Sequence, residues 1–316
     1  MDRRGNVYVT GALLLPRRVD IATIKYSPEG ALLWAARYHG SGERFHYPRA
    51  MAVDRQGNVY VTGVSYRTLL AKSGNYATIK YSSEGEELWA RLYDGPGRGY
   101  DSPAALALDK QGNVYVTGVS RGAGTRDDYA TIKYSSNGRL LWVRRYDGPG
   151  SNADYARAMA IDDQGNIYVT GMSFKRYTRN GCDYATIKYS PDGETLWVRR
   201  FNGVGNYYDC ANAITVDRWG NFYVTGISWG GWFPPSNAIY DYATIKYNPD
   251  GEEIWVLYYN GIENLEDSAT AIAVDKLGNV YVTGYITTDS NPPHYTCTDY
   301  CTIKYRQHGR ISNYPN

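Results

Sequence analysis

The sequence predicts an all-β fold assembled from one repeated four-stranded unit. Near-identical copies of the segment GNVYVTG begin at residues 5, 57, 112, 165, 220 and 278, at intervals of 52 to 58 residues. The chain has 33 tyrosines and 8 tryptophans but only 5 phenylalanines. Tyrosine and tryptophan suit half-buried strands that have one solvent-exposed face. No long segment has apolar residues at the spacing of an amphipathic helix. Four strands in a period of about fifty residues are typical of a β-propeller blade.

Each complete unit contains four stretches with strand character. In one unit these are PAALALD (103–109), NVYVTG (113–118), YATIKY (129–134) and LLWVRRY (140–146). The connections DKQG and SSNG are short hairpin turns that end in glycine, whereas VSRGAGTRDD and DGPGSNAD are longer and vary between units. Antiparallel pairing therefore places the short hairpins on one face of the fold and the long loops on the other. Binding residues concentrate on such loops, so we expect function on the long-loop face.

The ends of the chain leave the number of complete blades open. The first copy follows Met1 almost directly and lacks the opening strand, and the last unit ends in GRISNYPN without the usual tryptophan. We expect one domain over residues 1–316, with units near 2–47, 48–102, 103–155, 156–210, 211–268 and 269–316. The prediction is a β-propeller of six four-stranded antiparallel blades, one of them incomplete. The alternative is a fragment of a seven-bladed propeller.

The repeated pattern DxxGNVYVTG, DYATIKYSxxGxxLWVRRYDGPG and AxAVD resembles the bacterial SBBP β-propeller repeat and, more distantly, the NHL-type propellers. The resemblance covers nearly the whole chain. It implies a propeller fold and an extracellular or cell-surface location, but no single activity. The family pattern implies seven blades, whereas this chain supplies six copies.

Charge and hydropathy exclude several classes of protein. The net charge of +2, with 21% charged residues, argues against a nucleic-acid-binding protein, which normally carries a basic excess. No apolar run approaches the roughly 20 residues of a membrane span. The segment ALLLP at 12–16 is too short for the core of a signal peptide, so we expect no leader in this chain.

Residues that recur in every unit are expected to build the scaffold. The aspartate of DxxGN should cap the hairpin, and the glycine beside it should adopt a positive φ. The lysine of TIKY should form an ion pair with the hairpin aspartate, and the tryptophan of the fourth strand should pack between blades. These sets are Asp2, Asp54, Asp109, Asp162, Asp217 and Asp275; Lys25, Lys80, Lys133, Lys188, Lys246 and Lys304; and Trp34, Trp89, Trp142, Trp197 and Trp255.

The four cysteines are best interpreted as small buried hydrophobic residues. In an oxidising compartment, Cys297 could pair with Cys301, or Cys182 with Cys210. Their spacing resembles no zinc site.

Two acidic sets lie on the long-loop face. The first precedes the inner strand and consists of Asp101, Asp154, Asp209 and Asp267. These carboxylates could form a partial ring that binds Ca²⁺ at the mouth of the central channel, or they could cap the start of each strand. The second set begins the third strand, is expected to cap it, and consists of Asp20, Asp128, Asp183, Asp241 and Asp299.

The long connection at 227–241 carries Trp229, Trp232, Phe233 and Tyr240. Exposed aromatic clusters mark protein or glycan contacts, although this loop could instead fold over the blade edge. The four histidines are scattered, so no catalytic set is predicted. The expected function is a non-enzymatic binding or structural scaffold that presents its loop-rich face to a protein or glycan. The alternative is a divalent-cation-dependent hydrolase or lyase acting at the channel mouth.

Overall fold

The computed structural model describes residues 1–316 apart from residues 41, 43, 68–72, 176–180, 234–236, 262–264, 290–296 and 307–316. The described residues form 22 β-strands. The same residues include no helix of the length and hydropathy that a membrane crossing requires. The predicted all-β class is therefore confirmed.

The strands fall into six consecutive blades. Blade 1 contains β1 (Val7–Leu15), β2 (Arg18–Tyr26) and β3 (Leu32–Tyr38); blade 2 contains β4 (Phe45–Val53), β5 (Val59–Tyr66), β6 (Gly74–Tyr81) and β7 (Glu87–Tyr93); blade 3 contains β8 (Asp101–Leu108), β9 (Val114–Arg121), β10 (Asp127–Tyr134) and β11 (Leu140–Tyr146). Blade 4 contains β12 (Asp154–Ile161), β13 (Ile167–Phe174), β14 (Cys182–Tyr189) and β15 (Thr195–Phe201); blade 5 contains β16 (Asp209–Val216), β17 (Phe222–Phe233), β18 (Asn237–Tyr247) and β19 (Glu253–Tyr259); blade 6 contains β20 (Ser268–Val274), β21 (Val280–Asp289) and β22 (Cys297–Tyr305).

Strands within a blade pair antiparallel in chain order, as the hairpin lengths predict. Blades 2 to 5 have four strands each, and blades 1 and 6 have three within the described residues. A single parallel bridge between Val19 and Phe45 joins blades 1 and 2 into one sheet. The first strands of successive blades, β4, β8, β12, β16 and β20, contact one another. They therefore form the inner side of the assembly.

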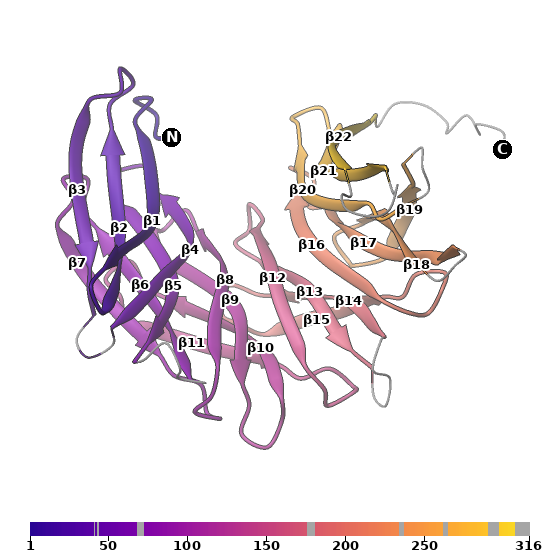
Figure 1. Ribbon diagram of the computed structural model, residues 1–316, viewed down its shortest axis with the longest axis horizontal. Coiled ribbons are helices and arrows are strands. Elements are labelled where there is room, and N and C mark those ends of the chain that lie inside the picture. The colour runs from indigo at the N-terminus through magenta and orange to yellow at the C-terminus, as the bar shows by residue number, and fades with distance from the viewer. Residues whose placement is uncertain are drawn as a thin grey trace.

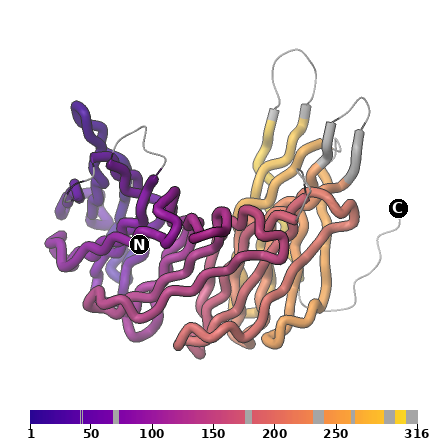
Figure 2. The backbone as a smooth tube through the Cα atoms, turned by 90° about the horizontal axis from the view of Figure 1, so that it is seen from below, coloured from indigo at the N-terminus to yellow at the C-terminus, as the bar shows by residue number. Residues whose placement is uncertain are grey.

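The blades follow one another along an open arc, with blade 1 at one end and blade 6 at the other (Figures 1 and 2). No extensive contact joins these two blades in the described part of the chain. The end faces are accordingly uncovered: Val9 of blade 1 is 49% exposed whereas the equivalent Val61 is 0% exposed, and Tyr300 of blade 6 is 96% exposed whereas Tyr76 is 0% exposed. The closed ring predicted from the repeat is thus not present in the described residues.

The aspartate of each hairpin acts as the predicted cap. Asp162 Oδ1 accepts the backbone N–H groups of Gln164 and Asn166 at 3.0 and 2.8 Å. Its Oδ2 accepts the Asn166 amide at 2.8 Å and the Tyr168 hydroxyl at 3.1 Å. The turn glycine, Gly165, has φ +83°. The same hydrogen bonds recur at Asp2, Asp54, Asp109, Asp217 and Asp275.

Lysine and tryptophan side chains join each blade to the next. Lys133 Nζ and Trp142 Nε1 both donate to the carbonyl oxygen of Pro191, at 2.9 and 3.1 Å. The indole lies against Gly193, where an added Cβ would come within 2.9 Å of the ring. The predicted packing of tryptophan between blades is therefore confirmed.

The ion pair predicted between lysine and hairpin aspartate is wrong for four of the six lysines. Each of these ammonium groups donates to a backbone carbonyl in the next blade, because the strand end points across the blade interface. The bonds are those of Lys25 to Ser83, Lys80 to Ser136, Lys133 to Pro191 and Lys188 to Pro249.

Candidate functional site

Each inner strand of blades 2 to 6 contains a β-bulge. At the bulge, one extra residue stands between two residues that pair with the second strand of the blade, which is β5, β9, β13, β17 or β21. A bulge re-aims a side chain and is common beside functional sites. The inserted residues, here called the bulge row, are Arg49, Ala104, Arg157, Asn212 and Thr270. Sequence reasoning missed them, although the signal was present: a variable residue sits between alanine or proline neighbours in each of units 2 to 6.

The bulge leaves no room for a side chain at the last glycine of GNVYVTG. At Gly171 an added Cβ would collide with the Tyr155 carbonyl oxygen of the bulged inner strand. Equivalent collisions occur at Gly63, Gly118, Gly226 and Gly284. Blade 1 has no inner strand within the described residues, and the Cβ position of Gly11 is open. The repeated motif thus encodes the close approach that positions the bulge row.

A hollow of about 520 Å³ lies over the inner strands near the long-loop face. Its lining includes Arg49, Tyr100, Tyr155, Arg157 and Met172. Arg49 and Arg157 are exposed, and Arg157 Nη1 donates to the side chain of the neighbouring bulge residue, Asn212, at 2.7 Å. The hollow therefore combines two guanidinium groups with two tyrosine rings.

The Tyr155 phenol is suited to hydrogen bonding. Burial and the nearby Asp127 carboxylate raise its pKa, so the hydroxyl keeps its proton at neutral pH. Its oxygen lies 3.3 Å from Asp127 Oδ2.

The four acids predicted as a metal ring, Asp101, Asp154, Asp209 and Asp267, occupy equivalent positions at successive blades. Each is at most 1% exposed, and one carboxylate oxygen of each accepts a backbone N–H six residues upstream. Burial raises the pKa of all four, to about 6 for Asp154. Among the described residues, the structure brings only Asp154 of this set into a group of three acids, with Asp128 and Asp147.

The predicted aromatic loop is largely an extended ribbon, because β17 continues to Phe233 and β18 begins at Asn237. Trp229 packs against Gly205, with its ring centroid 5.5 Å from that of Tyr207. The Tyr240 ring lies 5.8 Å from that of Tyr208. These two aromatics thus contact the adjacent loop. The side chains of Trp232 and Phe233 lie outside the described part of the structure.

Cys182 and Cys210 are free buried thiols that pack with Met172. Burial raises the pKa of Cys210 to about 11, so both behave as the small hydrophobic residues expected. The disulfide alternative for this pair is wrong. Cys301 is also free, and the Cys297 side chain lies outside the described residues.

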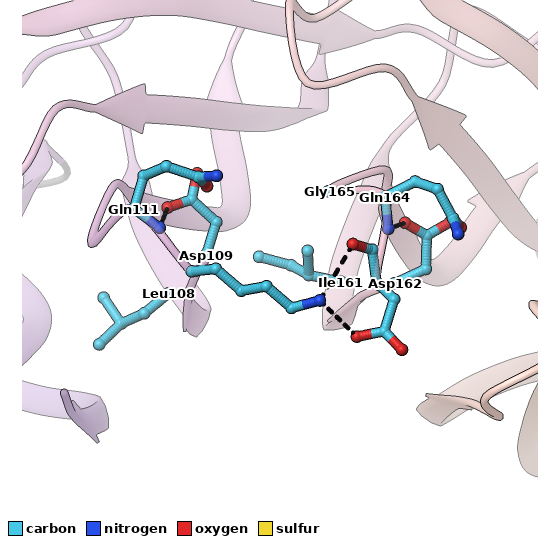
Figure 3. Close-up of a pocket in the computed structure, with 9 residues that line it drawn as sticks. Leu108, Asp109, Gln111, Ile161, Asp162, Gln164 and Gly165 are labelled. Atoms are coloured by element: carbon cyan, nitrogen blue, oxygen red, sulfur yellow. Dashed lines mark hydrogen bonds and ion pairs between the residues drawn. The ribbon is translucent and has the colours of Figure 1, made fainter. Parts of the chain in front are cut away.

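The opposite face, formed by the short hairpins, has a smaller hollow of about 180 Å³ between blades 3 and 4. The turns of Asp109 and Asp162 lie on either side of it (Figure 3). Lys110 Nζ closes the gap by pairing with the Asp163 carboxylate at 2.8 Å. This face therefore carries the repeated aspartate caps, with an ion pair between two of its turns.

Comparisons with known proteins agree with this architecture. A model of the SBBP β-propeller repeat matches residues 40–70, 141–173 and 254–290. An uncharacterized WD repeat-containing protein, L264 of Acanthamoeba polyphaga mimivirus, is 22% identical over 311 residues. That alignment covers 83% of this chain but 20% of the relative, so the chain spans about a fifth of its length.

A solved structure, that of the polysaccharide lyase Uly1, superposes with a TM-score of 0.58 at 12% sequence identity. The superposition covers 99% of this chain and 81% of the lyase. At this identity the likeness concerns the fold alone. The repeated strands and the inter-blade contacts agree with the matched segments: residues 40–70, 141–173 and 254–290 match the SBBP β-propeller repeat, within a chain that repeats one β-sheet unit.

Proposed function

We infer that this protein is a non-catalytic scaffold that binds an acidic polysaccharide in the hollow between Arg49 and Arg157. The observation that carries the proposal is the pair of exposed guanidinium groups beside the Tyr100 and Tyr155 rings. Guanidinium groups bind carboxylate and sulfate oxygens through paired hydrogen bonds. A tyrosine ring offers an apolar face with a polar edge, which matches the alternating surfaces of a pyranose ring.

The side chains that line the hollow favour binding over lyase or hydrolase chemistry. The Tyr155 hydroxyl donates its hydrogen to Asp127 Oδ2, so its oxygen can accept a hydrogen bond from a sugar hydroxyl. The other titratable groups that line the hollow are Tyr100 and the two arginines. The lining thus supplies groups that can recognise a ligand. A long polysaccharide can also reach Asn212 and Thr270, which continue the bulge row.

The test is binding of polygalacturonate, neutral dextran and polyglutamate to the full chain by calorimetry. We expect polygalacturonate to bind with an affinity that falls as salt rises, and dextran not to bind. Arg157→Ala should weaken binding about tenfold, the loss expected for a charged hydrogen bond. Arg55→Ala, which removes an exposed arginine of the hairpin face, is the matched control and should bind as the wild type does.

Equal binding of polyglutamate and polygalacturonate would indicate an acidic protein partner instead. If polygalacturonate fails to bind, or binds Arg157→Ala as tightly as the wild type, the proposal is wrong.

A further inference from the structure

Two adjacent blade junctions on the long-loop face occupy equivalent places in the repeat but differ at two charged positions. At the junction of blades 4 and 5, the Lys175 ammonium lies 2.8 Å from Asp183 Oδ1. The same ammonium donates to the side-chain oxygens of Asn202 and Asn206, at 2.9 and 2.6 Å. A cation, supplied by the chain, therefore sits among three oxygens at this junction.

The junction of blades 3 and 4 has acids at the positions of two Lys175 partners but no lysine; Asp128 is equivalent to Asp183, and Ser151 stands in place of Asn206. The residue equivalent to Lys175 is Gly122, which has no side chain, and the residue equivalent to Asn202 is Asp147. One oxygen from each of Asp128, Asp147 and Asp154 lies within 4.8 Å of the other two. This junction thus has more negative charge than its neighbour and lacks the neighbour's ammonium.

One buried carboxylate at this junction has an unused ligand atom. Asp128 is 3% exposed; its Oδ2 accepts hydrogen bonds from Arg145 and Thr125, both at 2.9 Å, but its Oδ1 accepts none. In blade 4 the same Oδ1 atom, that of Asp183, is the one paired with Lys175. Asp154 is 0% exposed, its Oδ2 accepts the Gly148 N–H at 2.7 Å, and a hydrogen bond from the Ser173 hydroxyl favours its ionised form. A buried carboxylate oxygen without a partner is costly unless a cation binds it.

We propose that Asp128, Asp147 and Asp154 bind a hard divalent cation, Ca²⁺ in preference to Mg²⁺, at the position that Lys175 occupies in the next blade. Three carboxylates are the ligand type that such cations select. Ca²⁺ holds its oxygens at 2.3–2.6 Å, so ligands on one ion lie within about 5 Å of one another, as these do. Mg²⁺ needs shorter distances and near-ideal octahedral geometry. Asp147 is exposed, so water can complete the coordination shell from the solvent side.

The ion would link two blades, because Asp128 begins β10 of blade 3 and Asp154 begins β12 of blade 4. Arg145 already neutralises one oxygen of Asp128. The ion offsets the remaining repulsion among the three carboxylates. This inference does not depend on the proposed polysaccharide hollow, which uses other residues.

The experiment is calorimetric titration of the EDTA-treated full chain with CaCl₂ and, separately, with MgCl₂, together with thermal unfolding. We expect one Ca²⁺ per chain, a higher midpoint of thermal unfolding with Ca²⁺, and weaker binding of Mg²⁺. Asp147→Asn gives this exposed position the residue of the next blade and should weaken Ca²⁺ binding at least tenfold. Asp163→Asn, at an exposed acid on the hairpin face, should leave it unchanged.

A converse variant tests the comparison between junctions. Lys175→Gln combined with Asn202→Asp removes the ammonium at the second junction and adds a carboxylate to Asp183 and Asp209, the equivalents of Asp128 and Asp154, so the chain should bind a second Ca²⁺. Absence of the second ion would contradict the equivalence of the two junctions. Absence of Ca²⁺ binding by the wild type at millimolar concentration, or unchanged affinity in Asp147→Asn, would overturn the site. A preference for Mg²⁺ would overturn the assignment to Ca²⁺.

Discussion

Aspartates on the two faces of the arc have opposite electrostatic settings. On the hairpin face, the Asn279 side chain, the backbone N–H groups of Asn279 and Leu277 and the Tyr281 hydroxyl lower the pKa of Asp275. On the long-loop face, burial and the neighbouring carboxylates of Asp147 and Asp128 raise the pKa of Asp154 to about 6. The Asp275 carboxylate is therefore satisfied as an anion, whereas the Asp154 carboxylate is costly as an anion.

This difference teaches how a repeat protein separates stability from function. The hairpin face uses the same hydrogen bonds in all six units, so those residues explain why the units fold. The long-loop face keeps Asp154, a buried carboxylate that does not help folding as an anion, and the cation proposed above would offset that cost.

The largest expected effect is on stability, at the contact between blades 3 and 4 on the hairpin face. Trp142→Ala removes the ring that covers Gly193 and the hydrogen bond to Pro191, and should lower the free energy of unfolding by about 3 kcal/mol. Urea unfolding measures this loss. Trp219→Ala, at an exposed hairpin tryptophan, is the control and should change stability by less than about 0.5 kcal/mol. Equal losses in the two variants would mean that blades are not joined by the interior tryptophans.

A smaller loss is expected for the cap itself. Asp162→Ala leaves two backbone N–H groups, the Asn166 amide and the Tyr168 hydroxyl without their acceptor, at a cost of about 2 kcal/mol. Asp163→Ala, the adjacent exposed acid, should cost less than about 0.5 kcal/mol. Chemical unfolding of both variants decides the point. A neutral Asp162→Ala would contradict the view that the hairpin aspartate stabilises its blade.

The smallest expected effect concerns pH and the long-loop face. The folded-state pKa of Asp154, about 6, lies above the unfolded value of about 3.9, so its contribution to stability is present at low pH and is lost as the pH rises through 6. In EDTA, the wild type should therefore lose about 1 kcal/mol more than Asp154→Asn between pH 5 and pH 7. Unfolding curves at the two pH values give this difference. Parallel pH profiles would place the pKa of Asp154 near its ordinary value.

Much of the fold could be predicted because its signals are local and repeated. The stretches assigned at 103–109, 113–118, 129–134 and 140–146 became β8, β9, β10 and β11 within a few residues of their observed bounds. The cap of Asp162 and the packing of Trp142 depend on neighbours whose spacing the repeat itself reveals.

The remaining features depend on the backbone of another strand or blade. Lys133 donates to a carbonyl oxygen, and every residue carries one, so no side-chain pattern identifies Pro191 as its partner. The bulge at Arg157 depends on the register between β12 and β13. Asp128 joins Asp147 and Asp154 only when two blades pack, so the sequence indicated acids on the correct face but not this combination.

The bulge allows the residues on the surface of the inner strands to vary. The bulge residue is the extra residue of its strand and has no partner on the neighbouring strand. Its side chain therefore has no cross-strand neighbour that it must fit. Arginine, alanine, asparagine and threonine already occupy this position within one chain, while the flanking small residues and the facing glycine recur. Each of blades 2 to 6 thus contributes one variable side chain to a row along the inner side of the arc. A new ligand specificity can then arise by single substitutions that leave every blade interface intact.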